Sequence, residues 1–134
     1  MKYFVDVNII IDLFLTRKPF VENAVLIFEA VKKINWTLYT SDNAITTSYF
    51  YLKKENGAVA AKKTIATFLR DIEIVPVSRA MLITASTSKI NDFEDAVQFE
   101  CAASIKGIDG IITRNKKDFK HSTIPVFAPE EVLF

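Results

Sequence analysis

The chain has 134 residues, half of them hydrophobic and 25% charged, and its formal net charge is +1. This size and composition fit one globular domain, residues 1–134, with a substantial core, and they exclude an intrinsically disordered chain. The near-neutral charge excludes a uniformly basic nucleic-acid-binding surface, although it leaves room for a local basic rim.

The sequence also bears on the compartment of the protein. Its one cysteine, Cys101, excludes an internal disulfide, and we expect it to be buried as a small apolar side chain. No apolar run is long enough to span a membrane, and no basic-plus-apolar leader opens the chain. We therefore expect a soluble, cytoplasmic protein with no membrane partner.

Predicted strands and helices alternate along the chain. Short β-type runs occupy residues 2–5, 36–40, 73–77, 110–113 and 125–127. Between them, apolar residues recur at steps of three and four over residues 20–34 and 61–72, and residues 44–52 and 94–105 are helical by composition. This alternation predicts an α/β fold with a mostly parallel sheet covered by helices on both faces. Residues 2–5 are apolar on both sides, which favours a central strand.

A carboxylate ends the first predicted strand, because Asp6 follows the apolar run at residues 3–5. An acid at that place lies at the mouth of a parallel sheet, where open α/β folds bind ligands. Asp6 could instead cap the helix that follows, but Asn8 is available for that cap. A carboxylate in so apolar a setting is costly unless a positive charge offsets it, which favours a functional role for Asp6.

A second acidic segment, residues 91–95, reads Asn-Asp-Phe-Glu-Asp and opens a predicted helix. Asp92 and Asp95 have the spacing of a helix cap, and acids are favourable in the first turn of a helix. Three acids within four residues nevertheless exceed what a cap needs. Glu94 and Asp95 point about 100° apart on a helix, so we expect Asp95 to face the mouth of the sheet and Glu94 to face solvent.

A third segment joins a short strand to a basic cluster. Thr113 and Asn115 fall at the carboxyl edge of the strand, where they can position a ligand, and Asp118 follows closely. The cluster consists of Arg114, Lys116, Lys117 and Lys120. These cations form either a solvated loop or a phosphate-binding rim beside a metal site.

Other polar and aromatic residues carry less weight. We expect Asp12, among apolar residues of the first helix, to face solvent or to be bonded locally. His121 has no second histidine or cysteine at ligand spacing, which argues against a metal-binding role. Tyr49, Phe50 and Tyr51 are expected in the core or on a dimer surface. The sequence has neither a glycine-rich phosphate loop nor a serine–histidine–aspartate set.

The three segments together resemble a PIN domain. The shared features are the Asp-Val-Asn start at residues 6–8, the Asp-Phe-Glu-Asp-Ala turn at 92–96, and Thr-Arg-Asn at 113–115 followed by Asp-Phe at 118–119. Their order and spacing extend the similarity over essentially the whole chain. The resemblance implies a three-layer α/β/α sandwich of about five strands and Mg²⁺- or Mn²⁺-dependent cleavage of RNA. Because small members include VapC-type toxins, it also implies a homodimer and a small antitoxin as partner.

The resemblance assigns roles by position. Asp6 matches the family's first acid and Asp95 the acid that opens a later helix. On this interpretation Asp6, Asp95 and Asp118 are catalytic and bind the metal ion, with Asp92 as a further ligand. The residues expected to position the substrate are Asn8, Thr47, Thr113, Arg114, Asn115 and Lys116.

Two of these positions depart from the family pattern. Thr47 stands where the family commonly has a glutamate, and Asn115 stands where many members carry an aspartate. An alternative to the metal-dependent ribonuclease is therefore a PIN-fold module that binds RNA or protein and cleaves weakly or not at all. A phospho-acceptor receiver fits poorly, because Asp6 follows no acidic pair and no mid-chain strand ends in an aspartate.

Overall fold

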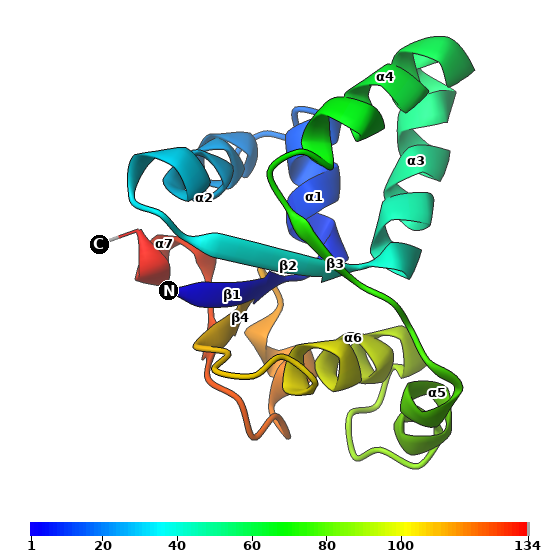
Figure 1. Ribbon diagram of the computed structural model, residues 1–134, viewed down its shortest axis with the longest axis vertical. Coiled ribbons are helices and arrows are strands. Elements are labelled where there is room, and N and C mark those ends of the chain that lie inside the picture. Colours follow the sequence, from blue (N-terminus) through cyan, green and yellow to red (C-terminus); the bar gives the residue numbers. More distant parts are fainter. Residues whose placement is uncertain (134) are drawn as a thin grey trace.

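The computed structural model describes residues 1–133 and is built on a five-stranded sheet (Figure 1). The strands are β1 (Lys2–Val5), β2 (Thr37–Ser41), β3 (Glu73–Val75), β4 (Gly110–Ile112) and β5 (Val126–Phe127). They lie in the order β3-β2-β1-β4-β5, and every neighbouring pair is parallel. The predicted parallel sheet of about five strands is confirmed, with residues 2–5 as its central strand.

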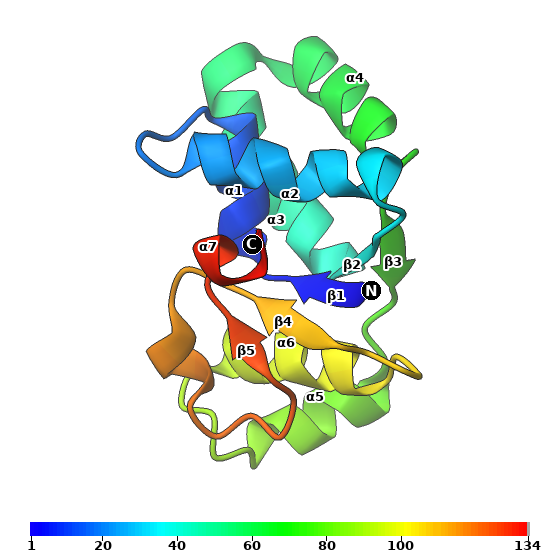
Figure 2. The same ribbon diagram turned by 90° about the vertical axis from the view of Figure 1, so that its left-hand side faces the viewer.

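Helices cover both faces of this sheet (Figures 1 and 2). One face carries α1 (Val7–Phe14), α2 (Val21–Lys33), α3 (Asp42–Asn56) and α4 (Ala58–Phe68), and the other carries α5 (Arg79–Ser86) and α6 (Phe93–Ala103). A 3₁₀ turn, η1 (Lys116–Phe119), and the short α7 (Pro129–Val132) complete the described chain. The result is the expected three-layer α/β/α sandwich.

The side chains of β1 alternate between two buried cores. Tyr3 and Val5 pack with apolar residues of α1 and α2, among them Ile9 and Ile27. Phe4 points to the opposite face and packs with apolar residues of α5 and α6. This burial on both faces explains the continuous apolar pattern of the first strand. Cys101 lies in the second core as a buried free thiol, as expected.

Four predicted helical segments correspond to helices of the structure, whereas two helices were not predicted. Residues 20–34, 44–52, 61–72 and 94–105 fall on α2, α3, α4 and α6. The helices α5 and α7 are short, with eight and four residues, so their apolar periodicity is too brief to stand out. The N-cap prediction for the first helix is wrong, because α1 begins at Val7, Asp6 holds the cap position, and Asn8 lies inside the helix.

The parallel sheet places three loops at one edge. Asp6 follows β1, α3 starts directly after β2, and Thr113 follows β4.

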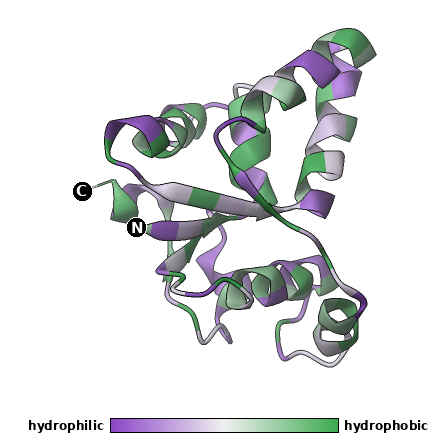
Figure 3. Cartoon of the chain, in the orientation of Figure 1, coloured by the Kyte–Doolittle hydropathy of each residue, from purple (hydrophilic) through white to green (hydrophobic). Residues whose placement is uncertain are grey.

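Figure 3 shows hydrophobic residues concentrated in α1 and mixed with hydrophilic residues along the longer helices. Among residues 1–133, no helix combines the length and apolar character needed to cross a bilayer.

Candidate metal centre

The carboxylate of Asp6 is held by side chains from two other elements. Only 3% of Asp6 is exposed. The Thr113 hydroxyl donates to Oδ2 at 2.6 Å, and Nε2 of Gln98 on α6 donates to Oδ1 at 2.8 Å. The Gln98 Oε1 atom in turn accepts from the backbone N–H of Val7 at 3.0 Å. These bonds fix the orientation of a buried acid at the junction of β1, β4 and α6.

Thr113 also organises the segment that follows β4. Its Oγ1 atom accepts from the backbone N–H of Asn115 at 3.1 Å, while the Asn115 carbonyl accepts from the N–H of Asp118 at 3.0 Å. A buried threonine therefore connects the Asp6 carboxylate to the turn that carries Asp118. Replacing it with valine would keep the shape and remove both bonds.

The first turn of α6 brings further acids to the same place. The Asp92 side chain accepts from the backbone N–H of Asp95 at 3.0 Å, which makes Asp92 the N-cap of α6. The cap interpretation from the sequence is thus correct for Asp92. Asp92 can cap α6 and still border the acid cluster, because the turn that it caps carries Glu94 and Asp95.

The acids from all three segments lie close enough together to affect the pKa of Asp95. Burial raises the pKa of Asp95 to about 7, assisted by the negative charges of Asp6, Asp92 and Asp118. Burial likewise raises the pKa of Asp6, although hydrogen bonds from Thr113 and Gln98 oppose this. None of the ion pairs formed among residues 1–133 includes these acids. The cluster is therefore electronegative, and no ion pair among residues 1–133 neutralises it.

Glu94 is exposed to solvent, as expected, and it also borders the acid cluster. Burial and the charges of Asp92 and Asp6 raise its pKa, so Glu94 lies within the same acidic field. Its side chain also lines a hollow on the side of α6 away from Asp95. Glu94 and Asp95 point in different directions from the helix, yet both border the site.

A second hollow of about 760 Å³ lies between α6 and the segment around η1, and we call it the lysine hollow. It is lined by Lys89, Asn91, Asp92, Asp95, Lys117, Asp118, Lys120 and His121. Three lysines and three acids of the cluster thus line one open space. Lys117 and Lys120 belong to the basic cluster that the sequence predicted. Lys89 was not predicted, because it lies in the loop before α6, far in sequence from that cluster.

Two other cations of the predicted rim have protein partners. The guanidinium of Arg114 pairs with Asp12 at 2.6 Å (Nε to Oδ2) and stacks 3.9 Å from the centre of the Phe20 ring. Lys116 pairs with Glu131 at 2.8 Å. The Arg114 guanidinium is therefore already bound by Asp12 and Phe20, so the geometry does not support the predicted contact between Arg114 and substrate.

The expected position of Asp12 is wrong. Its side chain is 1% exposed, and its main partner, Arg114, lies 102 residues away along the chain. Arg17 adds a longer contact of 4.0 Å. A buried acid inside the first helix is tolerated because a cation from the β4 loop reaches it.

Residues 2–117 match the family description of the PIN domain, in the group named PIN_3. The chain belongs to the PIN domain family. It is 30% identical to the ribonuclease VapC1 of Aquifex aeolicus (strain VF5) over 97% of this chain and 92% of that protein.

Solved structures support the same fold at lower identity. This PIN domain superposes on a chain of VapBC-1 from nontypeable Haemophilus influenzae with a TM-score of 0.70, at 18% identity over 97% of this chain and 99% of that one. For a chain of VapBC2 from Rickettsia felis, bound to a promoter DNA fragment, the TM-score is 0.68, at 17% identity over 96% and 98%.

The acids of this PIN domain suit a divalent cation that retains water. No group of three acidic, histidine or cysteine side chains within residues 1–133 is arranged to hold a metal ion by itself. Mg²⁺ needs only one or two carboxylates, because water and substrate phosphate complete its shell. Asp6 and Asp95 are two carboxylates of this kind, and the Oδ1 atom of Asn8 is buried without a partner among the described residues. Two carboxylates with no ion-pair partner among residues 1–133 have the oxygen ligands that a hard cation prefers.

Two predicted substrate-positioning residues keep open roles. Thr47 lies half-buried on α3 and lines neither hollow beside α6. Asn115 is exposed at the start of η1. Both remain predictions for this PIN domain.

The stability of the metal-free PIN domain should fall between acidic and mildly alkaline pH. The folded-state pKa of Asp95 is about 7 against an ordinary value of 3.8, so the folded protein binds more protons than the unfolded chain between these values. The contribution is complete below pH 3.8 and is lost as the pH rises through 7. Asp95 is partly solvated, so we expect a loss of about 1 kcal/mol.

Urea unfolding at pH 5 and pH 8, with chelator present, measures this difference. Asp95→Asn should flatten the pH dependence, whereas Glu55→Gln, at an exposed position near the end of α3, should leave it unchanged. An Asp95→Asn profile parallel to that of the parent would contradict the assignment.

Proposed function

We propose that this PIN domain is a divalent-metal-dependent endoribonuclease that acts as the toxin of a toxin–antitoxin pair in the cytoplasm. The observation that carries the proposal is the acid cluster of Asp6, Asp95 and Asp118, which lies at the carboxyl edge of the sheet with no ion-pair partner among residues 1–133. The relationship to the ribonuclease VapC1 of Aquifex aeolicus supports RNA as the substrate.

Each residue of the site has a distinct role in this proposal. Asp6 and Asp95 would hold Mg²⁺ or Mn²⁺, with Asp118 and Asp92 as further ligands. The bound ion would activate a water molecule and stabilise negative charge on the phosphoryl oxygens. Gln98 and Thr113 keep the Asp6 carboxylate in place through their hydrogen bonds.

The lysine hollow supplies the complementary charge for RNA. Lys89, Lys117 and Lys120 line it beside the acids, so a phosphate next to the cleaved one can bind there. The contacts are to the backbone of RNA and carry no sequence information by themselves. This placement explains how a nearly neutral protein can bind a polyanion.

Partners are proposed from the relatives and from the surface. The structural neighbours include VapBC proteins and a toxin–antitoxin complex from Klebsiella pneumoniae, which supports a small antitoxin as the partner of this chain. Phe50 and Tyr51 on α3 are exposed, which supports pairing of two copies.

A second candidate function is binding of RNA or protein without efficient cleavage. The neutral residues Thr47 and Asn115, at positions where the family commonly carries acids, favour this alternative. Both candidates use the same fold and the same basic hollow. They differ in whether the acid cluster suffices to support hydrolysis.

A metal-dependent cleavage assay separates the two candidates. Purified protein is incubated with a pool of single-stranded RNAs in EDTA, Mg²⁺ or Mn²⁺, and the product ends are mapped by sequencing. We expect cleavage with either metal and none with EDTA. Asp6→Asn, purified in parallel, controls for contaminating nuclease. RNA that is bound but remains intact with both metals would favour the binding module.

A further inference from the structure

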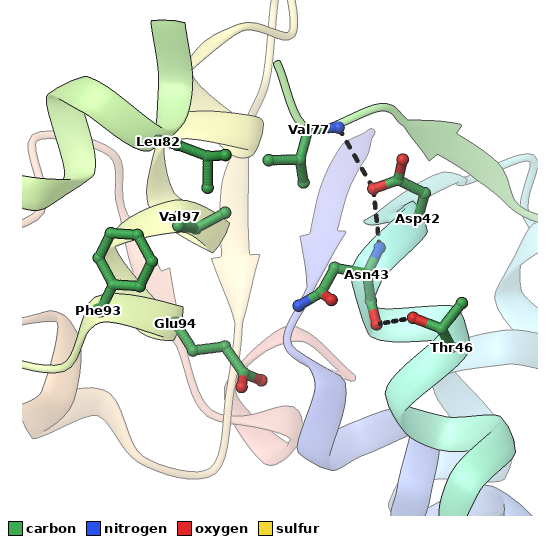
Figure 4. Close-up of a pocket in the computed structure, with 8 residues that line it drawn as sticks. All are labelled: Asp42, Asn43, Thr46, Val77, Leu82, Phe93, Glu94 and Val97. Atoms are coloured by element: carbon green, nitrogen blue, oxygen red, sulfur yellow. Dashed lines mark hydrogen bonds between the residues drawn. The ribbon is translucent and has the colours of Figure 1, made fainter. Parts of the chain in front are cut away.

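A hollow of about 550 Å³, distinct from the lysine hollow, borders the acid cluster on the other side of the first turn of α6 (Figure 4). We call it the apolar hollow. It is lined by Asp42, Asn43, Thr46, Val77, Leu82, Phe93, Glu94 and Val97. These residues come from α3, α5, α6 and the segment after β3.

One wall of the apolar hollow is hydrophobic. Phe93 and Val97 from α6 and Leu82 from α5 form it, as Figure 4 shows. Phe93 is 52% exposed although it is aromatic and lies within the first turn of a helix. An exposed ring at the edge of a hollow offers a flat surface for stacking.

The opposite wall is polar. Asn43 and Thr46 belong to the first turns of α3, and the Asn43 amide points across the hollow toward α6 (Figure 4). The Oδ1 atom of Asp42 already accepts from the backbone N–H groups of Asn43 and Val77 at 2.8 and 3.2 Å, and a carboxylate offers no donor. Among the polar side chains of this wall, Asn43 therefore offers both a donor and an acceptor to a ligand.

The apolar hollow borders the acid cluster through Glu94. Phe93 stands between Asp92, the cap of α6, and Glu94, whose carboxylate lines the hollow. Glu94 also lies within the field of Asp6 and Asp92. For a strand of RNA whose phosphate reaches the Asp6 region, the apolar hollow lies on the Glu94 side of that phosphate.

The charges of the two hollows indicate which part of a nucleotide each accepts. The lysine hollow contains Lys89, Lys117 and Lys120, whereas the residues that line the apolar hollow include two acids and no cation. Phosphate is therefore repelled from the apolar hollow and attracted to the lysine hollow. A neutral, flat group with hydrogen-bond donors at its edge complements the apolar hollow.

We propose that the apolar hollow binds one unpaired nucleobase next to the cleaved phosphate. The base stacks on Phe93, its exocyclic amino group donates to the Glu94 carboxylate, and Asn43 contacts another part of its edge. Adenine, guanine and cytosine carry such an amino group, whereas uracil does not. The proposal rests on the proposed function and adds a preference against uracil at one position.

The test compares short single-stranded RNAs that differ at one nucleotide. Once the cleaved phosphate has been mapped, each flanking position is given in turn adenine, guanine, cytosine, uracil or an abasic sugar, and kcat/KM is measured. At one flanking position we expect uracil and the abasic sugar to lower kcat/KM roughly tenfold relative to adenine. For Phe93→Ala, we expect adenine and the abasic sugar to become equivalent at that position.

Val59→Ala is the control, because Val59 is 86% exposed on α4 and lies outside the hollow. It should keep the parent's dependence on the base. Thermal melting verifies that each variant is folded, and sedimentation compares their oligomeric states with that of the parent.

The outcomes distinguish this inference from the proposed function. If RNA is bound but not cleaved, the same series is read as binding affinity, and loss of the base effect in Phe93→Ala supports the inference alone. Cleavage that depends on no flanking base, or a dependence unchanged in Phe93→Ala, overturns the inference and leaves the nuclease intact. A base effect that persists while Phe93→Ala alters the oligomeric state assigns the hollow to a protein contact. RNA that is neither bound nor cleaved overturns both.

Discussion

Asp6→Asn is expected to reduce RNA cleavage about a thousandfold or more, because several kcal/mol of transition-state stabilisation would be lost with the metal ion. Asp6 is the buried member of the acid cluster, and among the charges that raise the pKa of Asp95 its effect is the largest. An amide has almost the same shape but no negative charge, so the substitution tests charge with little change in packing.

The fold should survive this substitution. The Thr113 hydroxyl keeps an acceptor in the amide oxygen, whereas Gln98 Nε2 loses the one that it now uses. Against that loss, a buried charge is removed, and its burial is what raises the pKa of Asp6. We expect the unfolding free energy to change by no more than about 1 kcal/mol.

Cleavage rates and urea unfolding of the same preparations check both parts of the expectation. Glu55→Gln removes one exposed carboxylate outside the cluster and should cleave at the parent rate. Cleavage by Asp6→Asn at the parent rate would contradict the metal-site assignment. A variant that is unfolded would instead show that Asp6 is needed for structure.

Arg114→Met is expected to destabilise the protein by about 3 kcal/mol, because removing one partner of a buried ion pair leaves the other charge uncompensated. Asp12 is 1% exposed at its side chain and pairs with Arg114 at 2.6 Å, while Arg17 approaches only to 4.0 Å. Methionine preserves much of the apolar stem of Arg114 over Phe20 but cannot neutralise Asp12.

Urea unfolding of Arg114→Met and of two further variants measures this effect. Lys116→Met breaks the exposed pair with Glu131 and should cost less than about 1 kcal/mol. The double variant Asp12→Asn/Arg114→Met contains no lone buried charge, so it should be more stable than Arg114→Met. Equal losses for Arg114→Met and Lys116→Met would show that the buried pair has no special role.

Much of the site was predictable because parallel strands share one carboxyl edge. An acid after the first strand and a threonine after the fourth must come together once those strands are neighbours, and β1 and β4 are paired. The acids at the start of α6 were also identifiable from their density in one turn. The PIN resemblance rests on these features, and the family match supports it.

The partners of individual side chains were not predictable in the same way. Gln98 resembles any polar residue on a buried helix face, yet it bridges Asp6 and the backbone of Val7. Arg114 belongs to a basic run in the sequence, yet only Lys117 and Lys120 of that run line the lysine hollow. Lys89 and Asn43 carry no local signal, since their proximity to the acids depends on how α3 and the loop before α6 are packed.

By itself, the sequence determined the strand and helix alternation, the central place of β1 and the three segments that carry the acids. These features depend on hydrophobic periodicity and on strand ends, which are local properties of the chain. Only the tertiary structure decided which charges are paired, which remain free and where the two hollows open. Those outcomes depend on contacts between residues about a hundred positions apart, such as Asp12 with Arg114 and Asp6 with Thr113, and no local pattern encodes them.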